Sequence, residues 1–379
     1  MKSHSPNNLC YLDYNATHPP FETVLKKGLD EYLSNYYNPS GITRFSLQNQ
    51  AKIERARKYF ANLTNKNETN FVFSSTGTEA NYLLIKALRS QHPTIDSVYV
   101  SPFEHSSMYA ALNEFGFRYD FIFTDKSGII NIQDLDAKLK NFSKPVICLY
   151  AGNETGVIQP MEEISNLTKK YASILISDLM QCFGKISFPF EILDGFSFSG
   201  HKIGGGMGAA LTYFPKMNAS MQLFSGGNQE NGHRAGTENI FAIDCFQKVS
   251  EIQIENLSEK NKRLLTFRNQ IEFKLKNLGC EIICENSERL PNTSFVRLPI
   301  QSVDFFLLGM EENGILISTG SSCKSRAREA SGSLLRMGYS EEEALQCVRI
   351  STGFFTTEDH IYKLLETFEN LLVKFSVSK

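Results

Sequence analysis

Apolar and polar residues follow two different periods along the first two thirds of the chain. Short β-branched or aromatic runs predict buried strands over 71–75, 97–101, 145–150, 173–178, 195–199 and 208–214. Between several of these runs the apolar residues recur every three or four positions, which predicts helices over 79–90 and 161–172. This alternation of strands and helices predicts an α/β fold with a mostly parallel central sheet covered by helices.

The pattern changes near residue 255. A long amphipathic helix is expected over 256–277, followed by strands over 281–284, 293–298, 314–319 and 347–351. A last helix is expected to begin near Thr356, because Thr356 and Asp359 have the spacing of a capping box. We therefore expect a large domain over 11–255 and a smaller α+β domain over 256–379. Residues 1–10 are expected to form a tail that is loose or packs with the small domain.

Composition excludes several classes of protein. The chain has 379 residues, of which 41% are hydrophobic, so it is long enough for a sizeable core. It lacks the long apolar run of a membrane helix or a signal peptide, and its net charge of -2 gives no basic stripe for nucleic acid. The 8 cysteines are scattered without a C-x-x-C pair, which argues against disulfides and a metal site and favours a reducing cytoplasm.

Lys202 is the first candidate for chemistry. It directly follows the predicted strand 195–199, at the end of a strand where open α/β sheets bind their ligands, and glycines come immediately after it. A lysine at this place is a phosphate binder, a Schiff-base former or a solvated surface residue. The glycines follow the lysine instead of preceding it, which excludes a phosphate-binding Walker loop.

Asp178 ends another predicted strand, 24 residues before Lys202, and Gln181 follows it. An aspartate at a strand end is often a simple helix cap. Pyridoxal phosphate (PLP), however, requires an acid that keeps its ring nitrogen protonated, so that the ring accepts electrons from a substrate carbanion. In that interpretation Gln181 donates to the hydroxyl of the ring.

The stretch "FSSTGTEANYLL" joins a predicted strand to a predicted helix through Gly77 and Thr78. A helix N-terminus offers free N–H groups and a positive dipole end, which suit a phosphate. By itself this stretch is equally typical of a capped turn between strand and helix. Together with Ser199 and His201 it predicts a phosphate-binding cup.

Two further polar residues follow predicted strands. His105 is either structural or a residue that stacks on the cofactor ring and moves protons. Asn153 belongs to an ordinary turn, or its amide contacts the ring hydroxyl and a substrate carboxylate.

Taken together, these stretches resemble the cysteine desulfurases, a branch of the fold-type I PLP enzymes related to class V aminotransferases. The resemblance covers nearly the whole chain. The matching stretches are "YLDYNAT" (11–17), "NPS" (38–40), "TGTEAN", "EHSS", "GNETGV", "SDLMQCFGK", "SFSGHK", "GGNQENGHRAGTEN" (226–239), "STGSSC" (318–323) and "VRISTG" (348–353). This resemblance implies PLP fold type I, with helices on both faces of the sheet.

The resemblance also implies a role for each candidate residue. Lys202 is expected to carry PLP as a Schiff base, with Asp178 at the ring nitrogen and Gln181 at the ring hydroxyl. The phosphate is expected to bind the backbone of Gly77 and the side chains of Thr78, Ser199 and His201. Thr237 is expected to reach the phosphate of a neighbouring subunit, which implies a homodimer. Arg349 is expected to clamp the substrate carboxylate, because its planar fork binds such a group bidentately.

The activity implied is conversion of L-cysteine to L-alanine, with a persulfide left on Cys323 for a protein sulfur acceptor. The loop after Cys323 has the length of the long-loop type but carries Lys324, Arg326 and Arg328, where relatives have small residues. These cations lower the thiol pKa, attract an acidic acceptor, or are merely solvated. Met180 stands where a smaller residue is common, and the sequence gives no reason for it.

The pathway and the exact reaction stay open at this stage. Only "SVSK" follows the last predicted helix, whereas relatives that serve iron–sulfur cluster assembly carry a docking tail. Thiolation of tRNA, assembly of another cofactor and sulfur modification of DNA are the other candidate pathways. Selenocysteine lyase, another PLP-dependent lyase or hydrolase of the kynureninase kind, and an inactive interaction protein are the alternative functions.

Overall fold

The computed structural model describes residues 9–218, 220–319 and 329–375. Its helices are α1 (Glu22–Ser34), α2 (Arg44–Thr64), α3 (Gly77–Gln91), α4 (Ser106–Glu114), α5 (Ile132–Asn141), α6 (Met161–Lys170), α7 (Ile240–Glu255), α8 (Leu257–Asn277), α9 (Val303–Glu312), α10 (Gly332–Arg336), α11 (Glu341–Leu345) and α12 (Glu358–Phe375). Its strands are β1 (Cys10–Tyr11), β2 (Phe71–Ser74), β3 (Ser97–Val100), β4 (Arg118–Phe121), β5 (Val146–Ile147), β6 (Leu175–Asp178), β7 (Gly195–Ser199), β8 (Ala210–Tyr213), β9 (Glu281–Ile282), β10 (Thr293–Arg297), β11 (Ile315–Leu316) and β12 (Cys347–Ser351).

The central sheet has seven strands in the order β2-β8-β7-β6-β5-β3-β4. Strand β8 is antiparallel to both of its neighbours, and the remaining neighbouring pairs are parallel, which confirms the expected mostly parallel sheet. All six strands expected for this region are present. Strand β4 was not expected, because it lies at the edge of the sheet and its sequence, RYDF, is largely exposed and polar.

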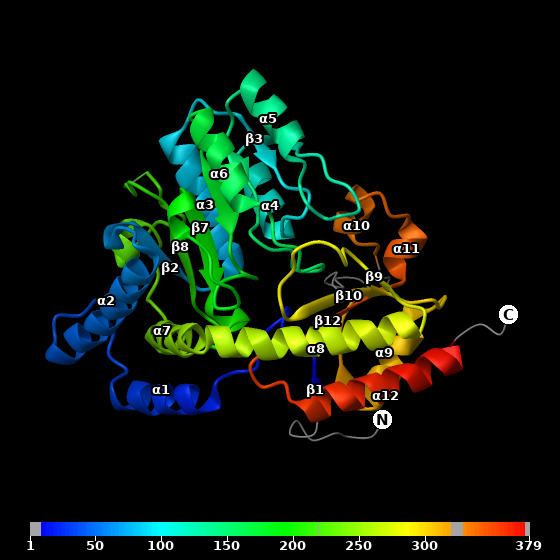
Figure 1. Cartoon of the computed structure of the whole chain (residues 1–379). Coiled ribbons are helices and arrows are strands. Elements are labelled where there is room, and N and C mark those ends of the chain that lie inside the picture. Colours follow the sequence, from blue (N-terminus) through cyan, green and yellow to red (C-terminus); the bar gives the residue numbers. More distant parts are fainter. Residues whose placement is uncertain (1–8, 219, 320–328, 376–379) are drawn as a thin grey trace.

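Helices cover both faces of this sheet, as Figure 1 shows. Side chains alternate between the two faces of a strand, so neighbouring residues enter different cores. In β3, Val98 and Val100 pack in a cluster with α3 and α4, whereas Tyr99 belongs to the cluster that α2, α5, α6 and α7 cover. The sheet is therefore buried on both sides, and ligands can reach it mainly at the ends of its strands.

The C-terminal part of the chain forms a second core. Strands β12, β10 and β9 make an antiparallel sheet, and α8, α9 and α12 pack beside it (Figure 1). Cys10 and Leu12 are buried in this same core, because β1 pairs in parallel with β11. The chain thus begins in the C-terminal part and then crosses to the central sheet. The division into domains at residue 255 stays a prediction.

The expected capping box of the last helix is wrong by one residue. The hydroxyl of Thr357 accepts from His360 N at 3.4 Å, and Nδ1 of His360 accepts from Thr357 N at 3.3 Å. The hydroxyl of Thr356 instead accepts from Gly353 N at 2.9 Å, inside the turn before the helix. Two adjacent threonines made the register ambiguous, and burial of Thr356 decides it.

Candidate active site

A cavity of about 610 Å³ opens at the carboxyl ends of the parallel strands, a size typical of small-molecule sites. One wall comes from the turns after β2, β3, β5, β6 and β7. The opposite wall comes from α9, from the segment after β11 and from β12. Of the residues expected at the site, the cavity brings together Gly77, Thr78, His105, Asn153, Asp178, Gln181, His201, Lys202 and Arg349.

Lys202 leaves β7 through a short 3-10 turn and points its amine into the cavity. Its Nζ donates to Asn15 O and Ala16 O, both at 2.8 Å. Burial, and then the positive charge of Arg349, lower the pKa of Lys202 to about 8. A lysine in these surroundings gives up its proton far more easily than one in water, as an amine that attacks an aldehyde must.

Asp178 is the last residue of β6, and both of its carboxylate oxygens have partners. Oδ2 accepts from Asn81 Nδ2 at 2.9 Å, and Oδ1 accepts from Met180 N at 2.8 Å. The oxygen of Asn81 in turn accepts from the Ser197 hydroxyl at 2.5 Å, which fixes the orientation of the Asn81 amide. Asp178 is therefore a fixed, buried acceptor facing the cavity, suited to a protonated ring nitrogen.

The N-terminus of α3 brings Gly77 and Thr78, two residues of the predicted phosphate cup, to the cavity wall. A Cβ atom on Gly77 would lie 2.8 Å from the methyl carbon of Met180. Met180 thus packs against Gly77, which accounts for a residue that the sequence pattern leaves unexplained. A side chain at position 77 would require the end of the Met180 side chain to move.

The structure places Ser199 and His201 differently. The Ser199 side chain is not part of the cavity wall, and its hydroxyl donates to Ala209 O at 3.3 Å. His201 lines the cavity, with Nδ1 3.2 Å from the hydroxyl of Thr17. Burial lowers the pKa of His201 to about 4, so this ring is neutral at physiological pH.

His105 is the N-cap of α4 and lines the cavity. Its Nδ1 accepts from Ser107 N at 3.2 Å. Because a backbone N–H can only donate, the neutral ring must carry its proton on Nε2. The tautomer of His105 is therefore set by the helix that it caps.

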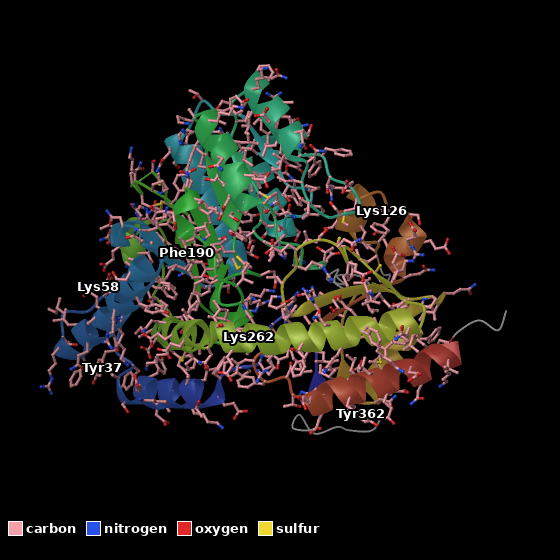
Figure 2. The ribbon with its side chains drawn as sticks, in the orientation of Figure 1. Tyr37, Lys58, Lys126, Phe190, Lys262 and Tyr362 are labelled. Carbon is pink, nitrogen blue, oxygen red and sulfur yellow. The ribbon has the colours of Figure 1, made fainter. Side chains whose placement is uncertain are left out.

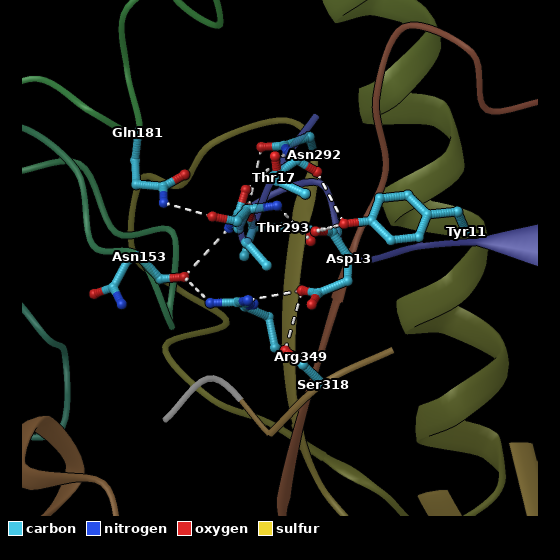
Figure 3. A network of polar contacts seen from close by, with 12 residues as sticks. Tyr11, Asp13, Thr17, Asn153, Gln181, Asn292, Thr293, Ser318 and Arg349 are labelled. Atoms are coloured by element: carbon cyan, nitrogen blue, oxygen red, sulfur yellow. Dashed lines mark hydrogen bonds and ion pairs between the residues drawn. The ribbon is translucent and has the colours of Figure 1, made fainter. Parts of the chain in front are cut away.

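Arg349 on β12 reaches the cavity from the other side (Figure 3). Its Nη2 donates to Asp13 Oδ1 at 2.7 Å, and its Nη1 donates to Asn153 O at 2.8 Å. The hydroxyl of Ser318 also donates to Asp13 Oδ1, at 3.1 Å. The guanidinium is thus held flat at the cavity wall, between a carboxylate and a carbonyl.

Sequence reasoning missed Asn15, which connects most of this site. Its carbonyl accepts from Lys202 Nζ at 2.8 Å and from Gln181 Nε2 at 3.0 Å. Its side chain bonds Thr293 at 2.9 Å and Lys185 at 2.8 Å. Asn15 and Asp13 lie in the stretch "YLDYNAT", but only tertiary structure brings that stretch to the cavity.

Two further expected residues are not among those placed at the cavity. Thr237 is exposed and does not line this cavity. Cys323 lies outside the described residues, as do Lys324, Arg326 and Arg328. The described segment before them does reach the site, since Ser318 and Thr319 line the cavity.

The fold and the cavity define the class of protein. The chain belongs to the aminotransferase class-V family, whose profile matches residues 10–364. Members of this family are PLP-dependent enzymes. Within residues 9–218, 220–319 and 329–375, histidine, cysteine and acidic side chains form no group of three that could hold a metal ion.

The relatives narrow the class to the cysteine desulfurases. A cysteine desulfurase of Nostoc sp. is 30% identical over 96% of this chain and 93% of its own. The crystal structure of a NifS-like protein from Rickettsia africae is 30% identical, with a TM-score of 0.86 over 96% of this chain and 99% of its own. A structure of SspA in complex with cysteine is 25% identical, with a TM-score of 0.77 over 92% and 99%. The predicted family and fold type are thereby confirmed.

Proposed function

We propose that this chain removes sulfur from L-cysteine at the cavity described above, with PLP held by Lys202 and the sulfur received by Cys323. The observation that carries the proposal is the meeting of Lys202, Asp178 and Arg349 in one cavity, from three distant parts of the chain. A partly neutral amine, a fixed carboxylate and a carboxylate-binding guanidinium are the groups that a PLP enzyme acting on an amino acid requires.

The residues present fit PLP. Asp178 offers a fixed acceptor for the ring nitrogen, and the N-terminus of α3 offers N–H groups for the phosphate. His105 and Gln181 line the space between them. PLP, when bound, supplies a ring that accepts the electrons left on the substrate when its Cα proton is removed.

Lys202 and His105 are the residues for proton movement. With a pKa near 8, the Lys202 amine is partly neutral at physiological pH and takes a proton from carbon without a strong external base. Nδ1 of His105 accepts from the backbone of the helix that it caps, so Nε2 is the ring nitrogen that carries the proton. We therefore assign the Cα proton to Lys202 and a supporting proton-transfer role to His105.

Arg349 positions the substrate. Its fork is already held by Asp13 and Asn153, so little rotamer freedom remains to be lost when a carboxylate binds. A substrate carboxylate shares this guanidinium with Asp13, and Asn153 adds its side-chain amide at the same wall.

Cys323 is proposed as the sulfur acceptor. Its thiolate bonds to the substrate sulfur, the carbon–sulfur bond breaks with its electron pair moving to carbon, and protonation of that carbon gives alanine. The segment 320–328 that contains it is flanked by residues at the site: Ser318 donates to Asp13, and Ser331 donates to Glu154 in the turn beside Asn153.

The other seven cysteines support this assignment by their environment, because all are buried. Burial raises the pKa of the thiols of Cys10, Cys280 and Cys284 to about 12, and that of Cys245 to about 11. The pKa values of the Cys148 and Cys182 thiols are also raised well above the ordinary value. Such thiols are poor nucleophiles, because the thiolate is the reactive form.

We further propose a homodimer. Thr237 is exposed on the loop 226–239, and this loop is anchored to β2 because Glu230 bonds Arg57 and accepts from Phe73 N. Gln229 of this loop donates to Ser40, which lies in the connection between α1 and α2. Tyr37 and Ile42 are exposed in the same connection, and Figure 2 shows Tyr37 at the outer edge of the molecule. An exposed apolar segment next to an unused polar loop suits contact with a second copy.

We also propose that the persulfide passes to a protein thiol in the cytoplasm. The seven described cysteines are all free, which suits a reducing compartment. Among the described residues no helix is long and apolar enough to cross a membrane. Iron–sulfur cluster assembly is one pathway that such an acceptor can serve.

The test is to mix the holoenzyme with cysteine carrying labelled sulfur and to map the label by mass spectrometry of its peptides. The label should appear on the peptide with Cys323, together with one alanine released. Cys323→Ser should keep the cofactor absorbance and lose both products. Cys280→Ser, a change at a buried cysteine in the C-terminal part, is the matched control and should behave as wild type. Label on another cysteine would overturn the assignment.

A further inference from the structure

Lys185 is a buried lysine that neither the sequence analysis nor the proposed function uses. It lies on the turn that follows β6 and Gln181, and its side chain is not part of the cavity wall. Its Nζ lies 2.7 Å from Gln181 Oε1 and 2.8 Å from Asn15 Oδ1. Both of these partners line the cavity, so Lys185 touches the site from behind.

The chemistry of Lys185 fixes how its two partners are turned. A lysine Nζ bonds amide oxygens only as a donor, so both oxygens must face it and both amide NH2 groups must point away. For Asn15, the NH2 group then donates to the hydroxyl of Thr293. For Gln181, the NH2 group donates one hydrogen to Asn15 O and has a second hydrogen to offer. The carbonyl of Asn15 can only accept, so this contact and the contact with Lys185 hold the Gln181 amide in the same orientation.

We propose that Lys185 is a positioning residue, which turns the Gln181 amide so that an N–H, and not the carbonyl oxygen, faces the cofactor. This inference rests on the proposed function, in which Gln181 donates to the hydroxyl oxygen attached to the PLP ring. That oxygen is anionic when the cofactor is bound, so a flipped amide would put one oxygen against another and weaken binding.

Burial and neighbouring positive charges both act on the Lys185 amine. Burial, followed by the charges of Lys202 and Arg349, lowers the pKa of Lys185 well below its ordinary value. The ionisable groups that interact with it are Cys182, Lys202, Arg349, Lys260, His18 and His201. The contacts of Nζ with Gln181 Oε1 and Asn15 Oδ1, in which the amine is the donor, offset part of the cost of burying it.

The test is a double-mutant cycle read from the absorbance of bound PLP during a pH titration. Lys185→Met keeps the length of the side chain and removes the donor. We expect Lys185→Met to raise the pH at which the absorbance of bound PLP is half changed by about one unit. A shift of this size corresponds to the loss of one charge-assisted hydrogen bond. In a Gln181→Met background the same change should leave the midpoint where Gln181→Met alone puts it.

Lys260→Met is the matched control. Lys260 is another buried lysine with a lowered pKa, about 7, but its Nζ donates to Gly184 O and Gln253 and does not touch Gln181. This variant should leave the midpoint within experimental error of wild type. An equal shift with Lys260→Met would show that loss of a nearby charge, and not the amide contact, moves the midpoint, and would overturn the proposal.

Thermal denaturation of each variant separates positioning from stability. If Lys185→Met folds poorly because the oxygen of Gln181 has lost its donor, a second comparison is made. The pH midpoint of the double variant Lys185→Met/Gln181→Met, which removes both partners of the bond, is then compared with that of Gln181→Met. A shift of the same size in both backgrounds, or no shift in either, overturns the inference. A wild-type chain that takes up no PLP overturns the proposed function as well, whereas a normally titrating wild type beside an unshifted Lys185→Met variant overturns this inference only.

Discussion

At the scale of single residues, burial sets the chemistry of the site. Lys185 and Lys260 are buried and Lys202 is half-buried, and all three line a small pocket that shares Lys202 with the cavity. Each has a pKa below the ordinary value of a lysine. The cause is the same in each case, since a low-dielectric surrounding disfavours the charged form. For Lys202 this provides a nucleophilic amine near neutral pH.

The first prediction concerns the pH dependence of cofactor capture by the apoprotein. Only the neutral Lys202 amine adds to the aldehyde of PLP, so the capture rate should rise about tenfold per pH unit below pH 8 and level off above it. Stopped-flow absorbance measures this rate. Levelling only near pH 10 would mean that Lys202 has the pKa of an exposed lysine, and Lys202→Ala should show no covalent capture at any pH.

The second prediction concerns Arg349→Lys. This change keeps the charge beside Asp13 but loses the two-pronged contact, so the KM for cysteine should rise by about 10- to 100-fold, as expected for a lost charge-assisted hydrogen bond. Steady-state alanine release measures the effect. Arg297→Lys, on β10 of the same sheet, is the control and should leave KM unchanged, because Arg297 pairs only with Glu281 and Glu343 at the surface.

At the scale of elements, the site depends on where strands end. Strands β2, β3, β5, β6 and β7 run in the same direction, so their following turns meet at one edge of the sheet. The turn after β2 becomes the N-terminus of α3, and the turn after β6 carries Met180 against it. Two turns that are about 100 residues apart in sequence therefore meet at the N-terminus of α3.

The third prediction tests that contact. In Gly77→Ala the new Cβ meets the Met180 methyl carbon at 2.8 Å, so Met180 must swing toward the cavity. The end of a methionine side chain moves easily, so the melting temperature should change little, while PLP should bind about tenfold more weakly. The double variant Gly77→Ala/Met180→Ala should regain most of the affinity. Fluorescence titration of apoprotein with PLP measures both, and a double variant as weak as Gly77→Ala would contradict the packing explanation.

At the scale of the whole molecule, the site joins two cores and is proposed to need a second copy. The N-terminal stretch packs first against the C-terminal core through β1 and then brings Asp13 and Asn15 to the central sheet. Thr237 is exposed in one copy, where it has no part in the cavity wall. If the proposed dimer brings Thr237 to the partner's cavity, the phosphate site is completed by assembly as well as by folding.

The fourth prediction tests the assembly. Ile42, which is 95% exposed beside the Thr237 loop, should be buried in the dimer, so Ile42→Asp should shift sedimentation toward the monomer and weaken PLP retention. Phe273→Asp is the control, because Phe273 on α8 is also exposed, at 69%, but lies on another part of the molecule. Equal dimer content in Ile42→Asp and wild type would place the interface elsewhere.

The sequence by itself determined most of the central sheet, several of its helices and the candidate residues for the chemistry. Strand-forming runs are local, and their β-branched and aromatic residues show directly in the sequence, so six strands of the central sheet were predicted. Lys202 and Asp178 were identified as candidates because each stands at the end of a predicted strand. Strand β4 was missed because an exposed edge strand has no apolar period.

Only the tertiary structure decided how these groups are held. Asn15 bonds Lys202, Gln181, Lys185 and Thr293, partners that lie between 166 and 278 residues away. No local pattern encodes such contacts, because they depend on the N-terminal stretch crossing from one core to the other. Burial is likewise a property of the folded chain, so the lowered pKa of Lys202 and the position of Lys185 behind Gln181 appear only when the chain is folded.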